Sequence, residues 1–316
     1  MGMRRTALLL ASTALVVLLT SGVALATGAS QTGTTAAPGT TIVVNSKGDG
    51  AKTGNCTLRE AIGAANANAR VDGCKAGSTT QRDAIHFSIG EEATIVLGSE
   101  LPLITDASGL TINGQQKAEI TVSGNDTVRV LHVGEGAKLA IANLTVSHGR
   151  ASSDGGGGIR SSYGSTLKVT NATFSGNSAY SYGGGIFNEG MATAILRNTI
   201  LDNGSGTNPG TTSGGNCYGI GAPGSDGGYN IEDGTSCYFS EANNSMPSTE
   251  PLLADSLANN GGPTKTIALL KGSPAINATP EATNGCGTEI TKDQRGVTRP
   301  QGEGCDVGAF ERVVRR

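Results

Sequence analysis

Four ionisable residues in the middle of the chain are the first candidates for chemistry. His148, Arg150 and Asp154 lie within one short segment, and Asp202 follows in a later one. Clustered carboxylates that bind Ca²⁺ beside a basic residue would suit polysaccharide elimination, and a pair of carboxylates across the bond would suit glycoside hydrolysis. No motif completes either arrangement, and His148 falls at a turn of the repeat described below. The sequence therefore assigns no catalytic residue, no cofactor and no metal ligand, and a Ca²⁺ site is conceivable without support from any motif.

Aromatic side chains offer a second kind of site. The chain has 3% aromatic residues and no tryptophan, and Tyr163, Tyr180 and Tyr182 beside glycine-rich loops are their only cluster. These rings could form a modest glycan or partner surface, or they could shield turn backbone from water; we favour the second interpretation. His86 and His132 lie in strand-like runs and are expected to be packed or edge residues.

Five charged residues near a cysteine form the last candidate group: Asp293, Arg295, Arg299, Asp306 and Glu311. A catalytic arrangement is conceivable there. Paired carboxylates and guanidiniums more readily hold a C-terminal cap together through bidentate hydrogen bonds. We predict this structural role.

Six cysteines indicate a disulfide framework. They lie as three neighbouring pairs, which are Cys56 with Cys74, Cys217 with Cys237, and Cys286 with Cys305. Six cysteines allow 15 connectivities, and neighbour pairing needs the least chain reach. No CxxC motif occurs and the histidines are distant, so a zinc site is disfavoured.

The N-terminus predicts export. Arg4 and Arg5 precede an apolar run, and Ala24-Leu25-Ala26 is typical of a signal-peptidase site, so we predict a signal peptide over 1–26 with cleavage between Ala26 and Thr27. An uncleaved membrane anchor is the alternative, and the export route stays open between Sec and Tat. Residues 27–40 are expected to be a flexible leader, and no later segment is apolar enough to span a membrane.

The charge excludes one class of partner. Cleavage would remove two arginines and no acidic residue, which takes the formal charge from −3 to −5. Nucleic acids are bound by basic faces, so a nucleic-acid partner is excluded. A ligand on a cell surface, such as a glycan or a cell-wall component, remains as the expected partner.

A repeat of 27 to 28 residues sets the predicted fold. The segments "LAIANLTVSHG" from Leu139, "LKVTNATFSGN" from Leu167 and "AILRNTILDNG" from Ala194 align without gaps. Alternating apolar positions would face inward, and glycine clusters would turn the chain. Asn143, Asn171 and Asn198 coincide and are predicted to stack as a ladder at one turn. We therefore predict a parallel β-helix over 81–249; a β-sandwich, the alternative, would lack this register.

One amphipathic helix is predicted before the repeats, within an N-terminal cap over 41–80. Thr57 and Glu60 form a capping box. Leu58, Ala61, Ile62 and Ala65 then make one apolar stripe, which suits a plug over the open end of a solenoid. A catalytic role for Arg59 or Glu60 is the less favoured alternative.

Four stretches of the sequence resemble one group of bacterial surface proteins. "CTLREAIGAANAN" resembles the CSLREA motif, with Thr57 in place of serine, and "FSGN" and "GGGI" resemble the repeats of polymorphic outer membrane proteins. The tail over 250–316, with "DQRGVTRPQGEGCDVGAFE", is similar to the choice-of-anchor Q domain. The resemblance implies an all-β protein, a right-handed parallel β-helix with a pectin-lyase-like backbone, closed by a disulfide-bearing C-terminal cap.

The resemblance also implies a role outside the cell. We expect a secreted or cell-surface β-helix protein with a structural, adhesive or binding role. The chain ends five residues after Glu311 without an LPxTG signal, a membrane anchor or an autotransporter barrel, so release or non-covalent attachment to the cell surface is expected. Intact FxxN occurs only in the middle repeat. The alternatives are a polysaccharide-active enzyme like pectate lyase, using carboxylates on the β-helix face, and a passive stalk within a larger envelope assembly.

Overall fold

The computed structural model describes residues 39–51, 53–89, 93–114, 120–202, 204–206, 215–254, 258–260 and 265–313. All of them belong to one compact unit, Ala36–Arg316. The predicted signal peptide, its cleavage site between Ala26 and Thr27, and most of the predicted leader lie outside the described residues.

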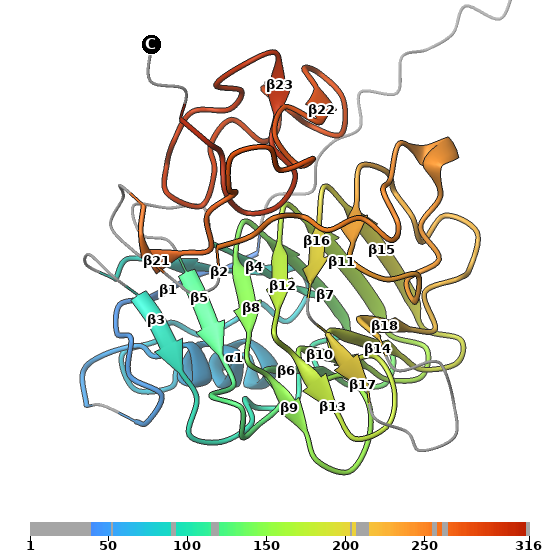
Figure 1. Ribbon diagram of the computed structural model, residues 1–316. Coiled ribbons are helices and arrows are strands. Elements are labelled where there is room, and N and C mark those ends of the chain that lie inside the picture. The colour runs from blue at the N-terminus through green and yellow to red at the C-terminus, as the bar shows by residue number, and fades with distance from the viewer. Residues whose placement is uncertain are drawn as a thin grey trace, which may run out of the picture. The chain divides into compact units, whose positions relative to one another are not determined.

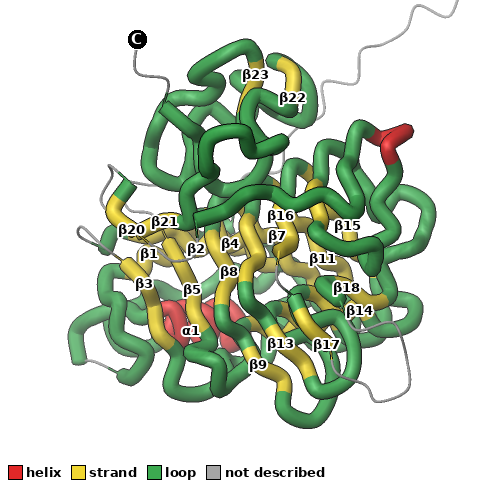
Figure 2. The backbone as a smooth tube through the Cα atoms, in the orientation of Figure 1, coloured by secondary structure: helices red, strands yellow, loops and turns green. Residues whose placement is uncertain are grey.

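Parallel strands stack coil upon coil, as Figures 1 and 2 show. One sheet contains β1 (Thr41–Val44), β2 (Asp83–Phe87), β4 (Leu110–Asn113), β7 (Lys138–Ala142), β11 (Thr166–Thr170) and β15 (Thr193–Arg197). A second contains β3 (Ala93–Val96), β5 (Ile120–Ser123), β8 (Thr145–Ser147), β12 (Thr173–Ser175), β16 (Ile200–Asp202) and β19 (Ile231–Glu232). The predicted parallel β-helix is confirmed.

Two smaller parallel sheets complete the coils. One contains β6 (Leu131–Val133), β10 (Ile159–Ser161), β14 (Ile186–Asn188) and β18 (Cys217–Tyr218). The other contains β9 (Arg150–Ala151), β13 (Ser178–Ala179) and β17 (Ser205–Gly206). A 3₁₀ turn, η1, covers Glu241–Asn243. The C-terminal region, from residue 250 onward, contains two short antiparallel pairs. These are β20 (Ala258–Asn259) with β21 (Lys265–Thr266), and β22 (Thr279–Pro280) with β23 (Gly304–Cys305).

Residues that align in the sequence repeat also pair between neighbouring strands. Leu139 pairs with Leu167, and Leu167 pairs with Ala194. Val146 and Phe174 pair in the same way on the neighbouring sheet. These positions are all buried, because alternate residues of each strand point into the solenoid.

One asparagine in each of three successive coils has a positive φ. These residues follow β7, β11 and β15, at the corner where the chain passes to the next sheet. Asn143, Asn171 and Asn198 have φ of 52°, 49° and 47°, a conformation that asparagine tolerates better than most residues. Asn143 donates to Asn113 at 3.0 Å, and Asn171 donates to Asn143 at 3.4 Å. Asn198 differs, because its side chain donates to the carbonyl of Asn284 in the C-terminal region.

The helix α1 (Leu58–Ala67) has the expected capping box and covers the N-terminal end of the core (Figure 1). Thr57 accepts from the Glu60 amide while the Glu60 side chain accepts from Thr57. Arg59 donates to Asp49 and to the carbonyls of Ser99 and Glu100. The Cys56–Cys74 disulfide closes the segment that carries the helix. Arg59 and Glu60 therefore have structural partners.

Residues 232–239 close the other end of the core. Cys217, bonded to Cys237, and Phe239 belong to the same buried cluster as the coils. Glu232 occupies an inward position opposite Leu201 and is fully buried. Its carboxylate accepts from the amides of Ser236 and Cys237, both at 2.9 Å, and so holds the closing loop.

The C-terminal region packs along the side of the solenoid. Strands β5, β8 and β16 are buried at every position, so the alternation of buried and exposed residues is lost. Gln294 accepts from the Thr145 hydroxyl at 3.1 Å, and the Ala309 amide donates to Thr173. The disulfide Cys286–Cys305 lies within this region. The region expected to close the fold thus covers a lateral sheet.

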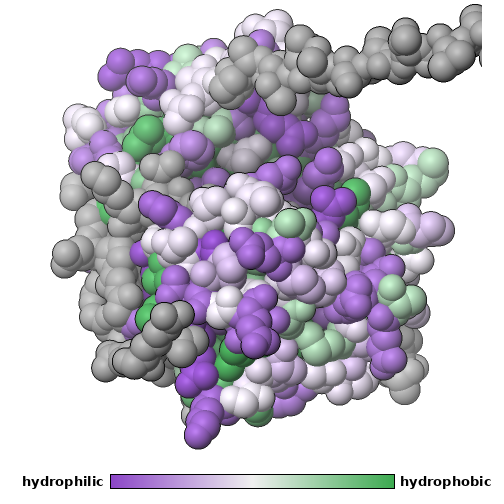
Figure 3. Space-filling view, turned by 90° about the horizontal axis from the view of Figure 1, so that it is seen from above, coloured by the Kyte–Doolittle hydropathy of each residue, from purple (hydrophilic) through white to green (hydrophobic). Residues whose placement is uncertain are grey.

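Figure 3 views the protein from above, the side on which the C-terminal region lies in Figure 1. Hydrophilic residues and residues of intermediate hydropathy predominate there, and apolar residues are scattered among them. Single apolar residues are ordinary on a solvated surface. The part of this face that the described residues form therefore shows no contiguous apolar patch.

Candidate functional site

One column of large side chains runs along the outward face of the β18–β14–β10–β6 sheet. His132, Arg160, Phe187 and Tyr218 occupy paired positions on successive strands. The neighbours of each on its strand are mostly buried, so these four positions point outward. Adjacent strands lie about 4.8 Å apart. The four side chains therefore follow one another along the solenoid axis.

The N-terminal part of this face is a network of ion pairs. Arg129 is 7% exposed and bonds with Glu100 at 3.0 Å and with Asp154. Arg160 also bonds with Asp154 and reaches Glu189 at 3.2 Å. Each carboxylate in this series therefore has a guanidinium partner, and Asp154 has two.

His132 joins the network at Glu100. Its Nδ1 lies 3.4 Å from the carboxylate of Glu100, and its Nε2 lies 3.0 Å from the hydroxyl of Ser162. Burial acts to raise the pKa of Glu100, but the hydrogen bond from His132 and the charge of Arg129 together lower it. A carboxyl with a lowered pKa stays ionised at neutral pH and is a poor proton donor.

The C-terminal part of the face is aromatic. The Tyr218 ring stacks on Phe187 with centroids 5.2 Å apart and on Tyr182 with centroids 4.6 Å apart. The guanidinium of Arg160 lies 5.6 Å from the centre of the Phe187 ring. The face thus changes from ion pairs to stacked rings along a single column.

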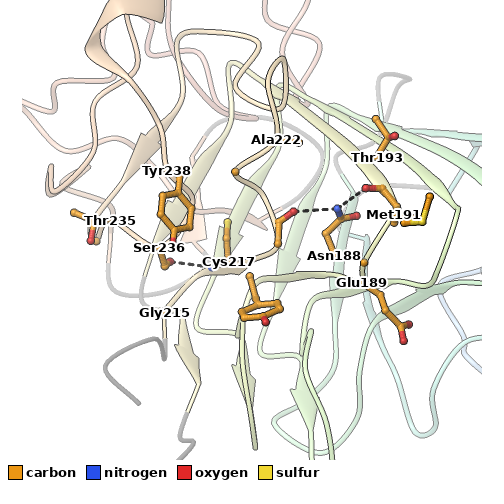
Figure 4. A pocket seen from close by; sticks show the side chains of 16 residues that line it. Asn188, Glu189, Met191, Thr193, Gly215, Cys217, Ala222, Thr235, Ser236 and Tyr238 are labelled. Carbon is orange, nitrogen blue, oxygen red and sulfur yellow. Dashed lines mark hydrogen bonds between the residues drawn. The ribbon is translucent and has the colours of Figure 1, made fainter.

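A groove of about 1090 Å³ adjoins the stacked rings. Figure 4 shows Tyr238 and Ser236 at one side of it and Met191, Glu189 and Thr193 at the other. Its lining includes three large side chains that are well exposed although mainly apolar: Tyr218 (41%), Tyr238 (73%) and Met191 (78%). Among the described residues that line the groove, Glu189 is the one that carries a charge.

A smaller hollow of about 150 Å³ lies at the charged end. It is lined in part by Glu100, Arg129, Arg150 and Asp154. Two of the four central candidates, Arg150 and Asp154, therefore share one hollow. Asp154 is held by arginines, so it is poorly suited to bind Ca²⁺.

The other two central candidates lie elsewhere. His148 has φ of 49° and its ring lies 3.2 Å from Asp126, which fits the turn position expected from the repeat. Asp202 is buried in β16 on a different sheet. Neither residue lines the hollow that Arg150 and Asp154 share. His86 lies on β2, where burial lowers its pKa.

The predicted tyrosine cluster is divided by the structure. Tyr182 belongs to the stack, the hydroxyl of Tyr163 donates to Met191 at the groove, and Tyr180 is exposed and does not line the groove. Sequence reasoning missed Phe187, Tyr218 and Tyr238. Extending the "GGGI" alignment by one residue places Arg160 and Phe187 in one column, and this signal could have indicated the face.

The charged residues of the C-terminal region form a buried cluster. All five are at most 8% exposed: Asp293, Arg295, Arg299, Asp306 and Glu311. Arg295 bonds with Asp293 at 2.9 Å and lies 3.6 Å from the centre of the Phe310 ring. Arg299 lies 3.5 Å from Glu311.

Burial raises the pKa of Glu311 to about 7, and the positive charge of Arg299 opposes this shift. Burial raises the pKa of Asp306 as well. The carboxylates of Glu311 and Asp306 also accept backbone amide hydrogen bonds within the C-terminal region, from Asp306 and from Asn277. The cluster therefore holds the C-terminal region together.

The described residues contain no group of three or more His, Cys, Asp or Glu side chains arranged to hold a metal ion. Their helices include none long and apolar enough to cross a membrane. Comparisons of the chain with protein-family models, with curated proteins and with solved structures found no match.

Proposed function

We propose that this protein is exported and acts at the cell surface as a binding protein without catalytic activity. Its binding face is the outward face of the β18–β14–β10–β6 sheet together with the groove beside it. Three disulfides support an oxidising compartment. The similarity of the helix segment and tail to CSLREA and choice-of-anchor Q sequences supports a surface role.

The observation that carries the proposal is the stack of Tyr182, Tyr218 and Phe187 beside an open groove. Only 3% of the residues are aromatic, yet these rings meet on one face and are not part of the solenoid core. Aromatic rings next to a few polar side chains are typical of binding sites. Because the column runs along the axis, an extended ligand could contact several coils at once.

The same face argues against polysaccharide cleavage. Hydrolysis needs one carboxyl that can donate a proton and a second that stays ionised. Glu100, Asp154 and Glu189 are each paired with an arginine, so each would have to give up an ion pair before it could take part in proton transfer. A polysaccharide-active enzyme remains the second candidate, because these carboxylates line the same face as the groove.

Binding and cleavage are separated by one set of assays with the purified protein. Binding to whole cells and to cell-wall fragments is measured by co-sedimentation for the unchanged protein, for Tyr218→Ala and for Tyr180→Ala, an exposed tyrosine outside the groove. We expect Tyr218→Ala to lose binding and Tyr180→Ala to retain it.

The opposing outcome is measured with acidic polysaccharides, with and without Ca²⁺. Absorbance from unsaturated uronate ends or a rise in reducing ends would show cleavage. If that activity disappears in Asp154→Asn, the protein is an enzyme and the proposal fails.

A further inference from the structure

We infer that the groove beside Tyr218 binds an uncharged polysaccharide chain. This inference rests on the proposed function and adds to it the chemical class of the ligand. It follows from the rings, the charge and the rigidity of the groove.

The rings supply flat apolar surface next to hydroxyl groups. Tyr218 and Tyr238 are 41% and 73% exposed, and both line the groove. Thr193 and Thr235 also line it, and both are exposed. A sugar ring has an apolar face of C–H groups and a rim of hydroxyls, so it matches rings that are bordered by hydroxyl groups.

The charge of the groove selects against acidic chains. The described lining residues include Glu189 and neither lysine nor arginine. Arg160 does not line the groove; it pairs with Glu189 at 3.2 Å and also with Asp154. An anionic sugar would therefore meet a carboxylate and no free cation, whereas an uncharged sugar can donate its hydroxyls to that carboxylate.

The groove is held in shape before any ligand binds. The Asn188 side chain donates to the carbonyls of Ala192 at 2.9 Å and Gly219 at 3.1 Å, and so ties two successive turns together (Figure 4). At the opposite side the Cys217–Cys237 disulfide and a hydrogen bond from the Cys217 amide to Ser236 fix the loop that carries Tyr238. A preformed site loses less conformational entropy on binding.

Isothermal titration of the full-length purified protein tests the inference. The probes are cellohexaose, xylohexaose, chitohexaose and mannohexaose as uncharged chains, and hexagalacturonate as an acidic chain of the same length. We expect at least one uncharged hexasaccharide to bind and hexagalacturonate not to bind. Tyr218→Ala and Tyr238→Ala should each weaken binding about tenfold, which corresponds to about 1.4 kcal/mol.

Two controls keep the result interpretable. Tyr180→Ala removes an exposed tyrosine outside the groove and should bind as the unchanged protein does. Because Tyr218 and Tyr238 are exposed, their variants should keep the melting temperature, which is measured in parallel. Glu189→Gln removes the one carboxylate of the described lining residues, so it should narrow the difference in affinity between the uncharged chains and hexagalacturonate.

The outcomes distinguish the ligand class from the binding function. Binding of hexagalacturonate alone, binding of no hexasaccharide, or binding that Tyr218→Ala leaves unchanged would each overturn the inference. If Tyr218→Ala still abolishes binding to cells while no hexasaccharide binds, the proposed function stands and the ligand is of another class, such as a surface protein. If Tyr218→Ala affects neither assay, both proposals fall.

Discussion

The same residue types have different roles in this protein, and their burial and partners distinguish those roles. Arg295 is nearly buried and holds the carboxylate of Asp293, the carbonyls of Asn260 and Glu311, and the face of Phe310. Arg150, by contrast, is exposed on the rim of a small hollow. A guanidinium that is fully occupied inside the protein stabilises the fold, whereas one at the surface is available to a ligand.

Arg295 should be needed for the stability of the C-terminal region. Arg295→Ala would leave the carboxylate of Asp293 buried without its ionic partner, and removal of one partner from a buried pair costs about 3 kcal/mol or more. We expect the free energy of unfolding, measured by urea denaturation, to fall by about that amount. Binding through the Tyr218 groove should not change.

Lys168→Ala is the matched control, because Lys168 is exposed on β11. Its free energy of unfolding should stay within about 0.5 kcal/mol of the unchanged protein. An Arg295→Ala variant as stable as this control would refute the structural role of the cluster.

At the scale of the elements, the helix α1 and the strand columns are fixed by different features. The helix begins where Thr57 and Glu60 cap each other and ends at Asn68, which has φ of 48°. The strands are held by parallel pairing and by columns of buried side chains that repeat every coil. Loss of the cap should therefore affect the N-terminal end first and leave the central coils intact.

Two replacements of Thr57 should differ in their effect on stability. Thr57→Ala removes the side chain that accepts from the Glu60 amide, and such a change costs about 1 kcal/mol. Thr57→Ser keeps the hydroxyl and should retain most of the stability. Thermal unfolding followed by circular dichroism measures both; equal losses in the two variants would show that the hydroxyl does not cap the helix.

At the scale of the whole described unit, three disulfides hold three separate places. Cys56–Cys74 lies at the helix, Cys217–Cys237 at the opposite end of the core, and Cys286–Cys305 in the C-terminal region. The cysteines are 18 to 20 residues apart in sequence. All six cysteines are used in these bonds, so the central coils between these places are stabilised instead by strand pairing, burial and side-chain hydrogen bonds such as Asn171 to Asn143.

Reduction of the three disulfides should loosen the segments that they close before it affects the central coils. A disulfide that closes a loop of 18 to 20 residues contributes about 3 kcal/mol to stability in the chain-entropy model. Reduction should therefore lower the melting temperature. Hydrogen exchange should increase first around residues 56–74, 217–237 and 286–305, and last in β7 and β11. A melting temperature indifferent to reductant, or early exchange in the central coils, would contradict it.

The sequence by itself determined the solenoid, its register and the capped helix. Inward positions must be apolar in every coil, so a buried column appears as a repeat that can be read without coordinates; Leu139, Leu167 and Ala194 are one such column. The capping box can also be recognised from the sequence, because Thr57 and Glu60 are three residues apart, the spacing that this motif requires. Neighbour pairing of the cysteines was favoured for a similar reason, namely short chain reach.

Only the tertiary structure decided where the C-terminal region lies and which face can bind. The hydrogen bond between Thr145 and Gln294 joins residues 149 apart in sequence, and such a contact leaves no local pattern. Outward side chains need not be apolar, because they are not buried in the core. The outward column of His132, Arg160, Phe187 and Tyr218 therefore mixes residue types and forms no visible repeat in the sequence. The groove exists because the fold brings the turn after β14 beside the Cys217–Cys237 loop, and proximity of that kind is a property of the folded chain.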